Sequence, residues 1–408
     1  MLAVVGGGIA GLACGLQLRA RGIDTLIIDA PPAVPPASWG NAGHIAVEQV
    51  APLASRDTIA SLPRRLFLCG GPVALPPRDI GRWLPFAWRL ARASGPQKFS
   101  AGKAALSSLL TQALPAWRRL AALAGAPEQV VEDGHIVVWE SLRGARRGRH
   151  SWQHADLGSA SVHELSRAEI KQLAGLLPTE PVDGLRFGGT ARVRDPGVLC
   201  ERLLQAFLAA GGEYRRARVA RVQLEPARAQ LDLEDGDRIE AARVLIAAGV
   251  GSRRLLQPLG IRAPLIAERG YHIQADAPAW PDIPPVVFED RSVIVSRFTS
   301  GLRVAGFTEF AAEDSAPDAR KWQRLRQHAA QLQLPFVGAT STWMGARPTL
   351  PDYLPAIGRS RHAGNLLYAF GHQHLGLTLA AITGELIAAL ACGETPEPDL
   401  APFALERF

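Results

Sequence analysis

Apolar and polar positions alternate between strand-like and helix-like patterns at the start of the chain. Leu2–Val5 is an unbroken apolar run of the kind that forms a buried parallel strand. Residues 12–21 have helical periodicity and end at Gly22, and residues 25–28 form a second apolar run that stops at Asp29. The pattern predicts a complete strand–helix–strand unit within 29 residues.

The glycines inside this unit indicate a dinucleotide site. Gly6, Gly8 and Gly11 form a GxGxxG motif, in which the first allows a tight turn, the second lets a pyrophosphate approach, and the third permits close helix–strand packing. The N-terminus of the helix presents N–H groups and a partial positive charge to phosphates. Asp29 follows where a carboxylate accepts hydrogen bonds from a ribose. We therefore predict cofactor contacts from Gly6, Gly8, Ile9, Ala10, Gly11 and Asp29.

Later segments predict further elements. Residues 196–210 form a helical stretch that Gly211 and Gly212 end, and residues 244–248 form another apolar strand. Val286–Phe288, 292–297 and 302–308 alternate with a period of two, which is typical of strands with one buried face. With 408 residues, the chain is long enough for two or three domains.

Composition narrows the function. The net charge is +7, but the basic residues are dispersed, and the densest cluster (Arg143, Arg146, Arg147 and Arg149) falls in an expected Gly-containing loop, so we predict no nucleic-acid partner. The four cysteines are far apart and form no CxxC motif, which favours a reducing, cytoplasmic compartment without disulfides or a metal site. No stretch predicts a membrane-spanning helix. Asn occurs only at positions 41 and 365, which draws attention to Asn41.

A segment that contains this residue carries a family resemblance. Ser38-Trp39-Gly40-Asn41-Ala42-Gly43-His44 resembles the S-x-x-N-A-G segment of bacterial D-amino acid dehydrogenases, FAD enzymes of the D-amino acid oxidase and glycine oxidase superfamily. The resemblance implies a non-covalently bound FAD and a loop beside the flavin. It assigns flavin-side positions to Ser38, Asn41, Ala42, Gly43 and His44. The alternative for Asn41 is a plain turn residue.

Three more segments extend the resemblance over nearly the whole chain. They are the turn Ala247-Ala248-Gly249, the element Arg269-Gly270-Tyr271-His272, and the pair Trp343-Met344-Gly345-Ala346-Arg347-Pro348 and Pro351-Asp352. A glycine-rich loop then opens a helix whose N-terminus faces the flavin in the family. By resemblance the cofactor contacts also include Val219, Ala248, Gly249, Gly371, His374, Leu375, Gly376, Leu377 and Thr378.

The order of these segments implies the fold class. It is α/β (α+β overall), with a Rossmann-type FAD-binding domain interleaved with a mixed-sheet substrate domain. We place residues 1–75, 161–261 and 337–408 in the FAD-binding domain, and residues 76–160 and 262–336 in the substrate-binding domain. The chain departs from the family at Tyr353, which follows Pro351-Asp352 where a glycine is usual, at His372-Gln373-His374, and at Asp29, where Glu is more usual. These departures bear on the substrate rather than on FAD binding.

The resemblance also implies the reaction. FAD enzymes of this family oxidise an amino acid to the imine by hydride transfer to flavin N5, and the motifs are most similar to the D-hydroxyproline and D-proline dehydrogenase branch. Arg347 lies at the position that binds the substrate carboxylate, a task that suits a planar guanidinium. His374 is a candidate for accepting the ammonium proton or bonding a ring hydroxyl, with a helix-entry histidine as the alternative. His44 and Tyr271 are weaker catalytic candidates.

Three alternatives for the electron acceptor and the assembly stay open. The family dehydrogenases pass electrons to the respiratory chain through a quinone or carrier protein, whereas an oxidase with the same motifs would reduce O₂. The chain could also be a flavoprotein subunit of a hetero-oligomeric dehydrogenase. Residues 82–92 mix Trp and Arg at helical spacing, which fits either a peripheral contact with the inner face of the cell membrane or a helix that packs Trp83 and Trp88 inward; we favour inward packing.

Overall fold

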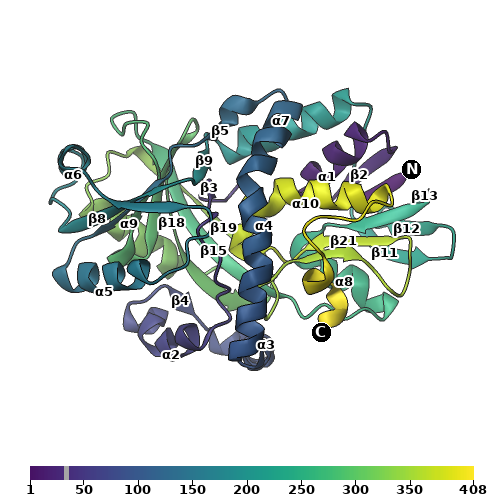
Figure 1. The fold of residues 1–408 in the computed structure, drawn as a ribbon, viewed down its shortest axis with the longest axis horizontal. Helices are drawn as coiled ribbons and strands as arrows, with labels where there is room; N and C mark the ends of the chain where they lie inside the picture. The colour runs from purple at the N-terminus through teal and green to yellow at the C-terminus, as the bar shows by residue number, and fades with distance from the viewer. Residues whose placement is uncertain (32–35) are drawn as a thin grey trace.

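The computed structural model describes residues 1–31 and 36–408. Figure 1 shows two large sheets, one on each side of the long helix α4 (Pro96–Leu123). The sheet on the right has six strands in the order β10-β2-β1-β14-β21-β20, and all of its pairings are parallel except the one between β20 and β21. Their bounds are Leu2–Val5 (β1), Thr25–Asp29 (β2), Glu213–Arg216 (β10), Arg243–Ile246 (β14), Ala356–Arg359 (β20) and Leu366–Phe370 (β21).

The predicted N-terminal unit is present. Strands β1 and β2 pair in parallel and flank α1 (Ile9–Ala20), which begins three residues earlier than the periodicity predicts because the glycine turn leads directly into the helix. Helices α1, α7 (Pro196–Ala209) and α10 (Gly376–Ala391) share one apolar core with α4. A three-stranded sheet, β11 (Val219–Leu224), β12 (Ala229–Leu233) and β13 (Arg238–Ala241), and α8 (Ser252–Leu256) share a second core with the six-stranded sheet.

The second large sheet is mixed. Its order is β19-β15-β18-β17-β16-β6-β8-β7, and β4 (Val73–Ala74) pairs with β18. The three strands with a period of two are confirmed as β16 (Val286–Phe288), β17 (Val293–Phe298) and β18 (Gly301–Ala311). The others are β6 (His135–Trp139), β7 (Ser161–Glu164), β8 (Asp183–Gly188), β15 (Ile266–Asp276) and β19 (Val337–Thr349). The described fold is the mixed α/β class that the sequence predicts.

Two predicted domain boundaries differ from the sheet pairing. We assigned residues 161–261 and 337–408 to the FAD-binding domain, but β7 and β8 pair with β6, and β19 pairs with β15, all in the nine-stranded sheet. The reason is that a strand joins whichever edge completes its hydrogen bonds, and local sequence does not reveal that edge.

The Arg-rich cluster lies on a helix, so the loop that we predicted for it is wrong. α5 (Leu142–Gln153) begins at Ser141, whose hydroxyl accepts the N–H of Gly144. Gly144 and Gly148 are buried, and a side chain at either position would overlap Asp290 or Trp139. These glycines therefore allow close packing of a helix and do not mark a loop.

We predicted that both tryptophans of α3 (Ile80–Ala93) pack inward, and this prediction is wrong for Trp88. Phe86 is the buried residue of this helix, Trp83 is half-buried, and Trp88 is 60% exposed. The remaining helices are α2 (Arg56–Arg65), α6 (Arg167–Ala174) and α9 (Ala319–Gln331), and a small sheet joins β3 (His44–Ile45), β9 (Ala191–Val193) and β5 (Val130–Val131).

One stretch among the described residues, Gln373–Ala391, has the length and hydropathy that a membrane span needs. Of its most apolar window, 78% is buried inside the fold, where α10 packs against α1 and α4. Its apolar character is therefore accounted for by the core.

Candidate functional site

The glycine turn after β1 forms an open cradle at the N-terminus of α1. Gly6 has a φ of +114°, and a Cβ there would overlap the carbonyl of Ala247; a Cβ at Gly11 would overlap the carbonyl of Gly6. At Gly8, by contrast, the nearest atom to an added Cβ is the Ser38 hydroxyl at 3.4 Å. The first-turn N–H groups of Ala10 and Gly11 have no acceptor within the helix, so they are available to an anion.

Asp29 is fixed at the end of β2 beside this cradle. Its Oδ1 accepts the N–H of Gly7 at 2.9 Å, and its Oδ2 accepts the hydroxyl of Tyr214 at 3.2 Å. Burial, together with the charge of Asp29, raises the pKa of Tyr214 to about 12, so this hydroxyl keeps its proton. Val219 starts β11 and is buried, and Gly249 with a φ of +57° follows Ala248.

The loop from Ser38 to His44 is held between the two large sheets. The Ser38 hydroxyl accepts the N–H of Ile9 at 2.9 Å, and Ser296 on β17 donates to the carbonyl of Ala42 at 2.8 Å. Asn41 Oδ1 accepts the N–H of Gly43 at 2.7 Å, which is the turn role that we gave as its alternative. The Trp343 indole packs against Gly40, where any side chain would overlap it.

The start of α10 adjoins the segment that follows this loop. Gly371 has a φ of +80°, and residues Gln373–Leu375 form a short 3₁₀ turn before α10 begins at Gly376. Thr378 accepts the N–H of Ala46 at 2.9 Å, and Trp117 of α4 donates to the carbonyl of Leu377 at 2.9 Å. These buried contacts fix the position of the helix N-terminus.

Arg347 lies at the centre of a second group of polar side chains. It stands opposite Glu268 on the neighbouring strand β15, and its Nη1 lies 3.2 Å from Glu268 Oε1. Thr349 and Tyr353 donate their hydroxyls to the other oxygen of Glu268, at 2.9 and 3.2 Å. Arg347 is 30% exposed whereas Glu268 is buried, so the carboxylate anchors the guanidinium from below.

Tyr353 explains one departure from the family pattern. It has a φ of +57°, a conformation that glycine adopts more easily, and it thereby places its hydroxyl on Glu268. Gln373 also has a positive φ, of +48°, and its amide donates to the Tyr353 carbonyl at 2.8 Å. Two residues in a sparsely populated backbone conformation thus support each other beside Arg347.

His374 belongs to the same group. Its Nε2 lies 2.7 Å from Oε1 of Gln49. The pKa of His374 is lowered to about 4, chiefly by burial; Glu268 opposes the shift, and the charge of Arg347 contributes to it. The imidazole is therefore neutral at neutral pH, and with Nε2–H donated to Gln49 its Nδ1 keeps a free lone pair.

The structure does not bring Tyr271 together with Arg347 and His374. Tyr271 is buried in a network in which its hydroxyl contacts Arg269 at 3.0 Å and Glu309 at 3.1 Å. Lys321 completes this network through an ion pair with Glu309. We therefore assign Tyr271 to the interior of the large sheet.

His44 lies apart from Arg347 and His374, in a cluster with His135 and Glu48. Its ring lies 4.3 Å from that of His135, and its Nε2 is 3.9 Å from Glu48. Within the described residues, neither the His44 Nε2 nor the Glu48 carboxylate has a hydrogen-bond partner. Burial lowers the pKa of His44 to about 4 and raises that of Glu48 to about 7. The three side chains could each offer a ligand atom to a metal ion, an arrangement that the cysteine pattern gave no sign of.

The sequence analysis missed Glu268, Thr349 and Gln49, and it marked Gln373 as a departure from the family pattern without assigning it a contact. Glu268 had a usable signal, because it directly precedes the Arg269-Gly270-Tyr271-His272 element, and a carboxylate buried in a strand needs a partner. Thr349 and Gln49 have no local signal, since their roles depend on contacts with distant segments, and the bond of Gln373 to Tyr353 depends on the fold of the loop between them.

Comparisons with known proteins agree with this architecture. The family described as FAD dependent oxidoreductase (DAO) matches residues 1–390. A D-amino-acid oxidase from Bradyrhizobium diazoefficiens is 30% identical over 415 residues, covering 100% of this chain and 98% of that protein. D-amino acid dehydrogenase 2 from Pseudomonas aeruginosa is 29% identical over 94% of this chain and 93% of its own.

A solved structure supports the fold. Glycine oxidase from Geobacillus kaustophilus superimposes with a TM-score of 0.74 at 23% identity, covering 100% of this chain and 98% of that one. The family match spans almost all of the chain, including both the glycine cradle and the strand that carries Arg347. This chain belongs to the DAO family of FAD-dependent oxidoreductases.

Proposed function

We propose that this enzyme oxidises a D-amino acid at its Cα–N bond and that the substrate is a cyclic secondary amine, D-hydroxyproline or D-proline. The observation that carries the proposal is the geometry of Arg347. Its guanidinium is held on one side by Glu268 and lies in a group with the neutral His374. A planar cation fixed in this way suits a carboxylate, which it can bind through two parallel N–H groups.

The cradle fits the family cofactor. Gly6, Gly8 and Gly11 leave room for a pyrophosphate at the start of α1, and Asp29 has lone pairs left for a ribose. The loop Ser38–His44 and the start of α10 would border the ring system. When bound, FAD supplies the two-electron acceptor for the substrate.

The chain's own residues supply binding and orientation. Arg347 binds the carboxylate and thereby sets the orientation of the Cα–H bond. Nδ1 of His374 keeps its lone pair because burial lowers the pKa of the imidazole to about 4, and it accepts a hydrogen bond from the amine in the neutral form that is oxidised. Because Tyr271 lies in the buried network and Tyr353 is bonded to Glu268, His374 is also the proposed contact of a ring hydroxyl.

Anaerobic reduction by a panel of amino acids tests the substrate. The absorbance of the oxidised flavin should bleach with D-hydroxyproline and D-proline, and not with their L-enantiomers. Bleaching by D-alanine with none by either cyclic amine would contradict the cyclic substrate while leaving D-amino acid oxidation intact. The exclusive use of L-substrates would contradict both parts.

For the electron acceptor we propose a respiratory-chain carrier, in keeping with the relative named as a dehydrogenase. The relative named as an oxidase supports O₂ as the second candidate. Oxygen consumption with the preferred substrate separates them: turnover with an artificial quinone but without O₂ uptake supports the carrier, and rapid stoichiometric O₂ uptake contradicts it.

A further inference from the structure

Helix α3 exposes a row of large apolar side chains. Ile80, Leu84 and Trp88 follow each other at intervals of four residues, so they lie along one side of the helix, and they are 50%, 54% and 60% exposed. The opposite side holds the helix to the fold through Phe86, whose ring lies 5.8 Å from that of Phe310. The core therefore does not account for the apolar row.

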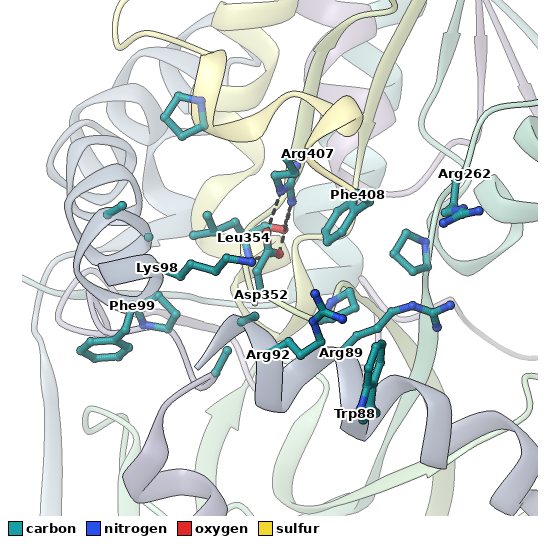
Figure 2. A pocket seen from close by; sticks show the side chains of 18 residues that line it. Trp88, Arg89, Arg92, Lys98, Phe99, Arg262, Asp352, Leu354, Arg407 and Phe408 are labelled. Atoms are coloured by element: carbon teal, nitrogen blue, oxygen red, sulfur yellow. Dashed lines mark hydrogen bonds and ion pairs between the residues drawn. The ribbon is translucent and has the colours of Figure 1, made fainter. Parts of the chain in front are cut away.

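A cavity rich in cations adjoins this row. It has a volume of about 560 Å³, and Trp88 forms part of its wall. Figure 2 shows Arg89 and Arg92 of α3, Lys98 of α4 and Arg262 along it. In the part of the chain that the structure describes, none of these four cations forms an ion pair.

The acidic side chain of the cavity does not neutralise them. Asp352 is the one acidic residue among the described lining residues, and it pairs with Arg407 at 2.7 Å (Figure 2). Among the described residues, some exposed arginines elsewhere are paired, such as Arg118 with Glu132 and Arg119 with Glu385, and others are not, such as Arg143 and Arg146 of α5; the cavity differs in gathering its unpaired cations around one hollow. The cavity thus concentrates positive charge beside an exposed apolar helix face.

We propose that α3 and this cavity form a docking surface for an anionic phospholipid bilayer. Ile80, Leu84 and Trp88 enter the boundary between headgroups and acyl chains, while Arg89, Arg92, Lys98 and Arg262 bind the headgroup phosphates. An amphipathic helix with Trp and Leu on one side and Arg beside them is typical of such contacts.

The combination favours a bilayer over other anionic partners. A free phosphate would use the cations and leave the apolar row exposed. A soluble acidic protein needs a larger apolar centre than three side chains of one helix for a stable interface. A bilayer uses both features. Each cation near an anionic surface strengthens binding about fivefold, and the apolar side chains strengthen it further when they leave water for the acyl-chain boundary. The inference does not depend on which substrate the enzyme oxidises.

Vesicle sedimentation of the FAD-loaded enzyme tests the proposal, with phosphatidylcholine vesicles compared with mixed phosphatidylcholine–phosphatidylglycerol vesicles. Wild type should bind the anionic vesicles at least tenfold more tightly, and added salt should weaken this binding. Both Arg89→Glu/Arg92→Glu and Leu84→Ser/Trp88→Ser should reduce it at least tenfold. The matched control Arg143→Glu/Arg146→Glu changes the same charge on exposed residues of α5 and should bind like wild type.

Several outcomes would overturn bilayer docking. They are no preference for anionic vesicles, equal losses in the α5 control, or a loss with the charge variant alone, which would mean that the cations adsorb to an anionic surface while the apolar row stays out of the bilayer. Full competition by glycerol phosphate together with an unaffected Leu84→Ser/Trp88→Ser variant would reassign the cavity to free phosphates. Flavin absorbance and thermal unfolding of each variant verify the fold. We expect both to match wild type, since all six substituted side chains are exposed.

Discussion

Glu268 and Arg347 face each other across the antiparallel strands β15 and β19, and their side chains form an ion pair at 3.2 Å. Glu268 accepts hydrogen bonds from Thr349 and Tyr353 as well, so one buried carboxylate binds three donors. These contacts hold the guanidinium in one orientation, which would lower the entropy lost on binding the carboxylate that we propose for this site.

The first prediction concerns this anchor. Glu268→Ala should lower the free energy of unfolding by about 3 kcal/mol, because it leaves a partly buried cation and two hydroxyls without their acceptor. Glu132→Ala, which removes the exposed partner of Arg118, should change it by less than about 1 kcal/mol. Denaturant unfolding of both variants measures the difference, and equal effects would show that the buried pair is not an anchor.

The second prediction concerns Gly270. Arg347 lies across this residue, and a Cβ there would overlap the guanidinium. Gly270→Ala should therefore weaken substrate binding at least tenfold while flavin content stays at the wild-type level. Gly364→Ala is the control, because a Cβ at that position has open space around it. Unchanged substrate affinity in Gly270→Ala would place the functional position of Arg347 elsewhere.

The third prediction concerns the cofactor. Asp29→Ala should lower FAD affinity about tenfold to a hundredfold, because it removes the carboxylate expected to hold the ribose. Asp24→Ala removes a nearby exposed carboxylate that pairs with Arg19 and should have no such effect. Titration of each apoprotein with FAD, followed by flavin fluorescence, measures the affinities. Equal affinities would argue against a ribose contact at Asp29.

The fourth prediction concerns pH. Burial lowers the pKa values of His44, His372 and His374 to about 4 and, with a smaller effect of Arg303, that of His272 to about 3. The unfolded chain binds more protons at these sites between about pH 6.5 and pH 4, so stability should fall as the pH falls through this range. Glu48, with its pKa raised to about 7, acts in the opposite direction.

Thermal unfolding at several pH values measures this dependence. The melting temperature should decrease between pH 6.5 and pH 4, and Glu48→Gln should make the decrease steeper, because it removes the group that stabilises the fold on acidification. A flat profile in wild type would show that these imidazoles are not buried in neutral form.

Elements defined by adjacent residues could be predicted from the sequence, whereas contacts between distant segments could not. The strand, glycine turn and helix at the N-terminus were predictable, since the residues that define them are adjacent, and the three strands from Val286 onward were found within a few residues of their bounds. The outward face of Trp88 was not predictable, because the inward side of α3 depends on what Phe86 meets.

The candidate site shows the same limit. Arg347 and His374 were proposed from their motifs, but Glu268 lies 79 positions before Arg347 and Gln49 lies 325 positions before His374. Only the sheet register and the loop between the sheets bring these pairs together. The left-handed backbone of Tyr353 was equally hidden, although the replacement of a usual glycine marked the position.

The central claim is that Arg347 binds the substrate carboxylate. Anaerobic stopped-flow reduction of the flavin, measured against substrate concentration in wild type and Arg347→Ala, tests it directly. We predict a substrate Kd raised about a hundredfold or more in the variant, with wild-type flavin content, because a charged hydrogen-bonding partner is lost. An unchanged Kd in a folded variant that is fully loaded with FAD would contradict the assignment.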